Sequence, residues 1–447
     1  MNDMDWMPLT WQQQRFWHWN RGELFWDVSS DGAVKIPITV TLPESQSERW
    51  ALDVADALRQ LTPIRTYIDP LGAPRQSPSH KSTPRSGDLV LFGDDPDVVT
   101  QELFETPMGL ANPAMLVGAT RIGNGRISEL HLVICHSATD GFALGLLTDL
   151  IRTHKFGRRI DEPLTLPSVL SRQQSDAGRA TSARSMRHNR RVVARLPSRP
   201  FRDFAPLAGL KDHIYTRLEY SVPGLASAAA RIANAASVSP ASVLVASLAL
   251  AFTEATDSEA FFSKVTFSNR SGSLANFFGC AYHEGLMLVD VDRTARAEDF
   301  VTTTFRAWIS AMANARYSAT ELVQILDARR ERDGESLRLR TGINLFWNGI
   351  PPSSLRVPVG DPSCRVSTRD WPDDSVDLEL KIFQFDSRID FDITMHNSLH
   401  GNDSLVKAVR HAVALIQTFE ESAVELSVDS WSASASDRAK GVIDDYE

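Results

Sequence analysis

The sequence predicts an α+β protein built of two lobes. Its 447 residues exceed the usual size of one hydrophobic core. Segments with strand and helix patterns follow one another in both halves at similar lengths. Between the halves, residues 171–202 hold nine arginines, one acid and almost no large apolar side chains, which is typical of a linker. We therefore expect an N-terminal lobe at 1–165, an Arg-rich linker at 166–205 and a C-terminal lobe at 206–447.

The N-terminal lobe is expected to begin with a helix at 12–19, because Thr10 can accept a hydrogen bond from the free N–H groups of its first turn. Residues 34–42 alternate apolar and polar side chains, which predicts a half-buried strand. Apolar residues at helical spacing predict an amphipathic helix at 47–61. The remaining elements are strands at 65–69, 88–92, 114–121 and 127–135, and a helix at 142–153.

The C-terminal lobe shows the same two patterns in turn. The expected strands are 215–222, 261–267, 286–291, 341–347, 378–385 and 389–395. The expected helices are 226–236, 240–256, 297–315 and 403–420. The Arg-rich stretch 171–202 is expected to be a crossing linker or an exposed, loosely held helix. Its role is left open between a solvated tether and a basic docking strip for an acidic partner.

Composition excludes several classes of function. The hydrophobic content of 43% and charged content of 23% are those of an ordinary soluble protein. A net charge of −9 argues against a nucleic-acid surface, which needs a basic face. The longest apolar stretch, 243–252, is far shorter than the roughly 20 residues that span a bilayer. The first residues lack the pattern of a signal peptide, so we expect a cytoplasmic protein and no membrane partner.

The number and spacing of the cysteines also favour a cytoplasmic protein. Cys135, Cys280 and Cys364 are widely spaced, which fits a reducing compartment better than a disulfide framework or a zinc site. The sequence has no Gly-rich phosphate loop, no HExxH and no Cys-x-x-Cys pattern. We expect no metal and no bound cofactor, so that any chemistry comes from side chains and an activated substrate.

One segment combines features of a reactive centre. A predicted strand ends at His136, and Asp140 and Gly141 follow at the start of a predicted helix. A helix N-terminus offers free N–H groups and a positive dipole end, and glycine permits a close approach of the backbone. A histidine of near-neutral pKa at that position can accept a proton from an attacking nucleophile. The alternative is a capping Asp140 beside a buried, structural His136, and the local pattern leaves both open.

The segment "CHSATDG" resembles the HHxxxDG motif of the condensation domains of nonribosomal peptide synthetases and their acyltransferase relatives. His136, Asp140 and Gly141 match the motif, whereas Cys135 stands in place of the first histidine. Four further blocks are similar to segments of that family. They are "PLTWQQQRFW", which carries Arg15, "IRTYIDPLGAPRQ", the Arg270-to-Gly279 segment "SNRSGSLANFFGCAYHEGLMLVDVD", and "RIDFDITMHNSLHGNDSLVKAVRHAV". We call the block that contains Arg270 and Gly279 the crossover segment. In it, Cys280 to Glu284 replace the family's Phe-Val-Asn-Thr run.

The resemblance implies two chloramphenicol-acetyltransferase-like lobes in a V-shaped pseudo-dimer, with a tunnel between them. It implies that His136 is catalytic and that Asp140 is structural, held by Arg270 of the other lobe, with Gly141 and Cys135 as supporting residues. We expect Cys135 to be a core thiol, because the sequence identifies no base or cation beside it. Candidate tunnel-lining residues are His283, Asn344 and Trp347, and for each the alternative is packing in the core.

The resemblance also implies the reaction. A free-standing condensation enzyme would join an amine or hydroxyl acceptor to an acyl or aminoacyl thioester, in nonribosomal peptide or other specialised-metabolite biosynthesis. The thioester would be presented on the phosphopantetheine of acyl or peptidyl carrier proteins acting in trans, and we expect a monomer. The first alternative is an acyltransferase that uses a coenzyme A thioester. The second is a catalytically silent module that only docks carrier proteins.

Overall fold

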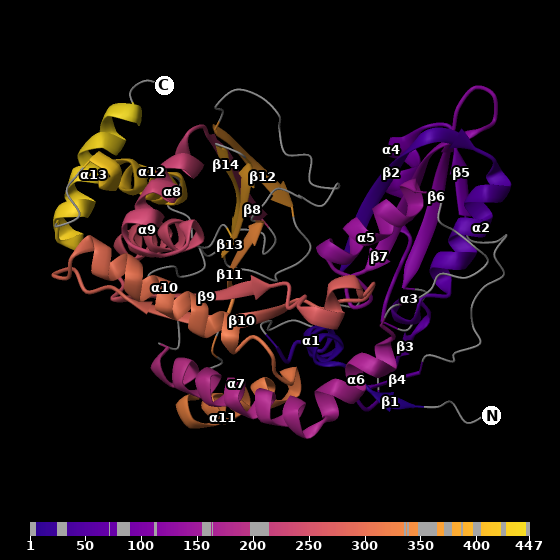
Figure 1. Ribbon diagram of the computed structural model, residues 1–447, viewed down its shortest axis with the longest axis horizontal. Helices are drawn as coiled ribbons and strands as arrows, with labels where there is room; N and C mark the ends of the chain where they lie inside the picture. The colour runs from indigo at the N-terminus through magenta and orange to yellow at the C-terminus, as the bar shows by residue number, and fades with distance from the viewer. Residues whose placement is uncertain are drawn as a thin grey trace.

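The computed structural model describes residues 6–24, 34–70, 72–77, 90–110, 114–153, 162, 164–196, 214–334, 337, 339–346, 364–370, 378–385, 388–396, 404–421 and 426–443. Figure 1 shows a four-stranded sheet and a seven-stranded sheet on opposite sides of the molecule, joined below by helices from both halves of the chain. The predicted α+β class is confirmed.

The four-stranded sheet belongs to the N-terminal half. Its strand order is β2 (Lys35–Gln46), β7 (Ile127–Cys135), β6 (Met115–Arg121), β5 (Val90–Gly93). Helices α2 (Glu48–Arg59) and α5 (Gly141–Arg152) share a core with one face, and α4 (Pro96–Glu105) covers the other. Strand β7 is therefore buried on both sides, which explains its nearly continuous apolar run up to Cys135. The strand and the helix that flank His136 are where the sequence predicts them.

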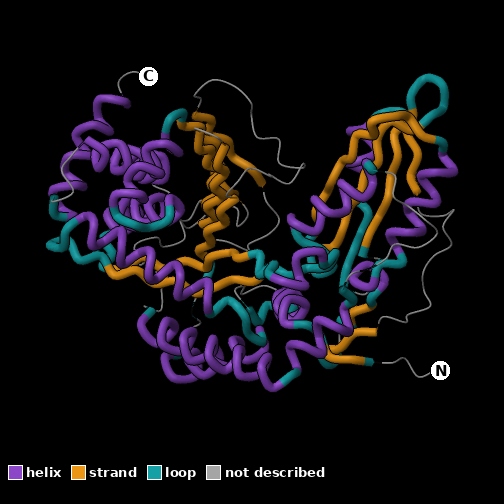
Figure 2. Tube along the Cα trace, in the orientation of Figure 1, coloured by secondary structure: helices purple, strands orange, loops and turns teal. Residues whose placement is uncertain are grey.

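The seven-stranded sheet belongs to the C-terminal half. In order across the sheet, its strands are β10 (His283–Asp290), β9 (Ala260–Phe267), β11 (Thr341–Phe346), β13 (Leu378–Phe385), β14 (Arg388–His396), β8 (Ile214–Val222) and β12 (Cys364–Asp370). The helices that share a core with this sheet are α8 (Leu225–Ala235), α9 (Pro240–Ala255), α10 (Ala297–Ala313), α12 (Ser404–Glu421) and α13 (Val428–Ile443). Figure 2 shows these helices gathered on one side of the sheet.

The two faces of this sheet differ because side chains alternate along each strand. Ile343, Leu380 and Ile393 point into the core beneath the helices. Their neighbours Asn344 and Lys381, which are paired in register on β11 and β13, therefore lie on the opposite face. The seven-stranded sheet thus has one apolar face and one mixed face, on which the rings of Phe346 and Phe383 stack beside these polar side chains.

A third core joins the two halves. Helix α1 (Trp11–Asn20) contributes Phe16 and Trp17 to a cluster that also contains Leu286 and Tyr317 of the C-terminal half. Helix α11 (Ala319–Asp333) packs against α1 from the same side. A small three-stranded sheet lies next to them, with the order β1 (Met7–Pro8), β4 (Arg75–Ser77), β3 (Tyr67–Ile68). The short helix α3 (Thr62–Arg65) precedes β3 in the chain. The first helix is therefore as much part of the C-terminal core as of its own lobe.

The predicted linker is not a solvated tether over its described part. Residues 166–174 form α6 (Leu166–Gln174), and α7 (Asp176–Arg195) follows as a 20-residue helix. Small and apolar residues recur on α7 at helical spacing and are buried against α11 and β10. They are Ser182, Ser185, Met186, Asn189, Val192 and Val193. The amino-acid composition of the segment does not reveal this buried face, because several of its residues are small or polar and add little hydrophobicity.

Several elements are present that the sequence patterns do not predict. Among them are α3, α4, α6, α11, α13, β1, β4 and β12. Among the described helices, none is by itself long and apolar enough to cross a membrane; the pair α8 and α9 meets the length and composition criteria only jointly, across a bend of 102°.

Candidate active site

His136 lies at the first residue after β7, in the turn that leads to α5. Its backbone N–H donates to the carbonyl of Val34, 2.7 Å away, which ties the turn to the start of β2. The side chain is half-buried. The imidazole is therefore mounted at the end of an internal strand of the sheet.

The tautomer of His136 is fixed by its own loop. Nδ1 lies 2.9 Å from the carbonyl oxygen of Thr139, and a carbonyl can only accept, so a neutral ring carries its proton on Nδ1. Nε2 then has a free lone pair, and no described residue is recorded as its hydrogen-bond partner. This is the protonation state that a general base needs.

Two aromatic rings enclose the imidazole. The ring centroid of Phe16, on α1, lies 5.1 Å from that of His136, and the centroid of Tyr282 lies 4.9 Å from it. Burial lowers the pKa of His136, and the nearby positive charge of Arg15 acts in the same direction. At neutral pH the ring is therefore unprotonated.

Asp140 joins the two halves of the chain beside this ring. It caps α5 by accepting from the N–H of Ala143 at 2.9 Å. Arg270 donates to the same carboxylate oxygen at 2.7 Å, and the N–H groups of Ala281 and Tyr282 donate to the other oxygen at 2.8 and 3.2 Å. The side chains of Asp140 and Arg270 are only 4% and 1% exposed. The contact expected between Asp140 and Arg270 is therefore present.

Arg270 also holds its own segment together. Its guanidinium donates to the carbonyls of Phe277 and Gly279 at 2.6 and 2.7 Å. The crossover segment is thus closed around one cation whose charge is balanced by Asp140. Residue Phe142, next to Gly141 at the start of α5, lies over the same guanidinium at 4.9 Å from ring centroid to Cζ. Its side chain is 49% exposed.

A second buried ion pair lies on the other side of His136. Arg15 of α1 binds Glu284 of β10 with two hydrogen bonds of 2.9 and 2.7 Å, and it also donates to the hydroxyl of Tyr282. Lys264 lies 3.9 Å from the same carboxylate. Although burial opposes ionisation, the charges of Arg15 and Lys264 lower the pKa of Glu284 to about 2. The pair therefore stays ionised throughout the physiological range.

Cys135, at the position of the motif's first histidine, lies in the core. Its side chain is 2% exposed and packs with Val99, Leu103 and Val133 under α4. The Sγ atom lies 3.0 Å from the hydroxyl of Ser137, and burial raises the pKa of the thiol. A buried thiol with a raised pKa is a poor nucleophile.

The three candidate tunnel-lining residues are placed differently. His283 is 1% exposed and its ring packs on Tyr317 at 4.2 Å, so it lies in the core and lines no open space. The reason is that the start of β10 is buried on both of its faces, since His283 and the next residue, Glu284, are both buried. Asn344 is half-buried on the mixed face of the seven-stranded sheet. Trp347 lies outside the described residues.

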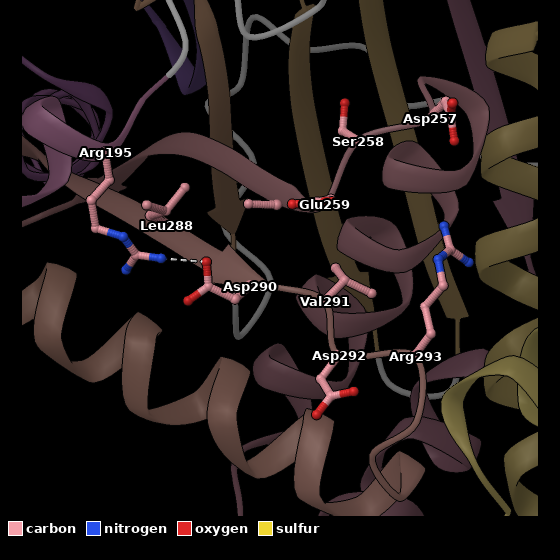
Figure 3. Close-up of a pocket in the computed structure, with 10 residues that line it drawn as sticks. Arg195, Asp257, Ser258, Glu259, Leu288, Asp290, Val291, Asp292 and Arg293 are labelled. Carbon is pink, nitrogen blue, oxygen red and sulfur yellow. Dashed lines mark hydrogen bonds and ion pairs between the residues drawn. The ribbon is translucent and has the colours of Figure 1, made fainter.

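A pocket elsewhere on the protein is not part of this site. Figure 3 shows it around Asp290, Asp292, Arg293 and Arg195, with a volume of about 770 Å³. It lies at the Asp290 end of β10, whereas the residues around the imidazole are at the His283 end, about 23 Å away at 3.3 Å per residue. In the part of the chain that the structure describes, no three His, Cys, Asp or Glu side chains are grouped as metal ligands.

Comparison with known proteins gives matches in structure alone. No protein-family model matches the chain, and no curated protein matches it. The X-domain from teicoplanin biosynthesis matches with a TM-score of 0.71 at 14% identity, over 96% of this chain and 98% of that one. The SgcC5 protein from Streptomyces globisporus matches with a TM-score of 0.66 at 14% identity, over 93% and 99%.

A third match is a structure described as the molecular basis for condensation domain-mediated chain release from the enacyloxin polyketide synthase. Its TM-score is 0.63 at 13% identity, over 92% of this chain and 82% of that one. The chain has the condensation-domain fold. The resemblance read from the sequence is thereby confirmed for the fold, and identities this low carry no activity across.

Within this condensation-domain fold, three residues near His136 were not predicted as site residues from the sequence. Phe16 and Tyr282 supply the enclosing rings, and Glu284 binds Arg15. Of the three, only Glu284 could have been recognised from the sequence pattern around it. A carboxylate next to the apolar run Leu286–Val289 of a strand needs a buried partner, and Arg15 is the one conspicuous cation among the early apolar residues.

Proposed function

We propose that this protein is a condensation enzyme, which forms an amide or ester bond by attack of an amine or hydroxyl acceptor on an acyl or aminoacyl thioester. The observation that carries the proposal is the state of His136. A half-buried imidazole with Nδ1 bound to Thr139 has Nε2 unprotonated, at the junction of the two lobes. The sequence motif and the fold agree with this role.

The mechanism needs no activation beyond the thioester. The acceptor's nitrogen or oxygen attacks the carbonyl carbon, a tetrahedral centre forms, and the thiolate leaves as the carbonyl returns. His136 Nε2 takes the proton that the attacking atom loses. An α-amine has an ordinary pKa near 8, so a useful fraction is already the free base, and the histidine chiefly orients it and collects its proton. A hydroxyl acceptor would depend more strongly on the basicity of the ring.

Asp140 and Arg270 serve this chemistry indirectly. Their ion pair and the two N–H groups of Ala281 and Tyr282 hold the loop of the imidazole against the crossover segment. A change at either residue therefore moves the base relative to a substrate bound between the lobes. A misplacement of about 1 Å can cost on the order of 10²-fold in rate.

The donor is proposed to arrive on the phosphopantetheine arm of a carrier protein. The exposed face of α7 supports a carrier as partner, because Arg184, Arg187, Arg190 and Arg191 are solvent-exposed there, and no ion pair with another described residue is recorded for them. Such a face attracts an acidic surface although the whole protein has a net charge of −9. A coenzyme A thioester has the same reactive end and is the alternative donor.

The test offers acetyl, octanoyl and phenylacetyl thioesters, each on a carrier protein and on coenzyme A, with a panel of amines and alcohols. Product formed from the carrier-bound donors, with a loss of about 10²–10⁴-fold in His136→Ala, supports the proposal. His188→Ala is the matched control, because His188 is also a partly buried histidine but lies on α7. Product from coenzyme A alone identifies the alternative acyltransferase. Carrier binding without product from any donor identifies a silent docking module and overturns the proposal.

A further inference from the structure

Tyr282 is held more tightly than packing alone requires. Its backbone N–H donates to Asp140 at 3.2 Å, and its hydroxyl accepts from Arg15. Arg15 is itself fixed by two hydrogen bonds to Glu284. Both ends of the residue are thus tied to ion pairs that connect the lobes, and its ring has no freedom to turn away from the site.

The fixed ring faces the imidazole. The ring centroids of Tyr282 and His136 are 4.9 Å apart with an angle of 35° between the planes, and Phe16 lies 5.1 Å from His136. The imidazole therefore has an aromatic neighbour from α1 and another from the crossover segment. Its Nδ1 is bound to Thr139, so the two rings and one hydrogen bond define its orientation.

We propose that Tyr282 is a positioning residue: its clamped ring holds the imidazole of His136 in the orientation that presents Nε2 to the acceptor. This inference rests on the proposed function of His136. It assigns a role to a residue at which the chain departs from the family's Phe-Val-Asn-Thr run. The ring acts on the reaction only through His136, and we assign it no contact with substrate.

The same contacts set the electrostatics of the ring. The charged groups next to His136 are Arg15 on α1 and Asp140 on its own loop. The Tyr282 hydroxyl accepts from Arg15, whereas the contact with Asp140 is made by the backbone N–H and persists in any variant. Removal of the side chain therefore admits water to the imidazole and takes one hydrogen bond from Arg15. Water stabilises the charged imidazolium, and the pKa of His136 should then rise towards its ordinary value of 6.5.

The experiment uses a chemical probe and needs no substrate. Diethyl pyrocarbonate acylates unprotonated imidazole nitrogens, and peptide mass spectrometry resolves the rate at His136 from that at every other histidine. The rate is measured from pH 5 to 8 in the wild type, Tyr282→Ala, Tyr282→Leu and Tyr282→Phe. His188 in the same digests is the internal reference, and Tyr317→Phe is the control for a hydroxyl lost from a buried tyrosine.

We expect the midpoint for His136 to lie below pH 6.5 in the wild type and in Tyr282→Phe, which keeps the ring. Tyr282→Ala and Tyr282→Leu should move it upwards and raise the limiting rate at least 3-fold, while His188 stays unchanged. A midpoint and limiting rate identical to wild type in both ring-deleting variants would overturn the inference, and Tyr282→Leu suffices if Tyr282→Ala does not fold. If the shift occurs but the thioester assay yields no product, the positioning stands and the proposed function fails.

Discussion

The guanidinium of Arg270 lies 2.7 Å from the carboxylate of Asp140, and this contact joins the two lobes. Asp140 follows His136 by four residues, in the loop between β7 and α5. Both side chains are almost completely buried. An ion pair of this kind fixes geometry more reliably than it adds net stability, because removal of its charges from water offsets most of the attraction.

Loss of one partner should be costly. Arg270→Met leaves Asp140 buried without its cation, and we expect the free energy of unfolding to fall by about 3–5 kcal/mol in urea titrations. Arg296→Met is the control, because Arg296 is 52% exposed and its contact with Glu298 is 3.8 Å. That change should cost less than about 1 kcal/mol. Equal losses in the two variants would contradict a structural role for Arg270.

The pH dependence of turnover should report the lowered pKa of His136. A base acts in its unprotonated form, so kcat/KM, which reports the free enzyme, should rise with pH through a midpoint below 6.5 and then level off. The cause is burial, assisted by the charge of Arg15. An alcohol acceptor makes the cleanest measurement, because it does not titrate in this range. The rising limb should be absent from the residual activity of His136→Gln; a limb of the same midpoint in that variant would assign it to another group.

Glu284 should make the fold sensitive to acid. Its pKa is about 2 when folded and near 4.5 otherwise, so its stabilisation is complete above about pH 5 and is lost as the pH falls towards 2. At roughly 1.4 kcal/mol per pKa unit, the contribution is on the order of 3 kcal/mol. Urea unfolding of Glu284→Gln should therefore show a deficit at pH 7 that shrinks below pH 5, to less than half its size near pH 3, and disappears only towards pH 2. Glu102→Gln, an exposed change on α4, should show no deficit at either pH.

The arginines of α7 should govern carrier binding if that face is the docking surface. Replacing Arg184, Arg187, Arg190 and Arg191 with glutamine should weaken binding of an acidic carrier protein and flatten its dependence on salt. The control removes the same total charge elsewhere. It replaces the exposed arginines Arg49, Arg296, Arg306 and Arg330. Surface plasmon resonance at 50 and 300 mM salt compares the carrier affinity of the two variants. Equal weakening in both would show that the loss comes from net charge and would contradict a docking surface on α7.

The centre of the site was predictable because its information is local. A strand that ends at His136 and a helix that begins after Asp140 follow from apolar periodicity and a capping residue, and the structure has both. The contact of Asp140 with Arg270 spans 130 positions and came from the family resemblance alone.

The surroundings of the imidazole could not be predicted in the same way. Phe16 and Tyr282 lie on segments far apart in the chain, and nothing near either residue indicates that their rings meet at His136. The buried face of α7 could not be predicted for a related reason. The buried face of α7 is made of small residues such as Ser182 and Ser185, and helical periodicity in small residues is weak in any measure of hydropathy.

The core that α1 shares with the C-terminal half also imposes an order on biosynthesis. Phe16 and Trp17 are synthesised long before Leu286 and Tyr317, which are among their buried partners. At about 5–20 residues per second, the helix waits roughly 15–60 s before those partners are made. Nascent chains arrested before residue 280 should therefore expose these aromatic rings to chaperones and to limited proteolysis, and chains arrested after residue 400 should protect them.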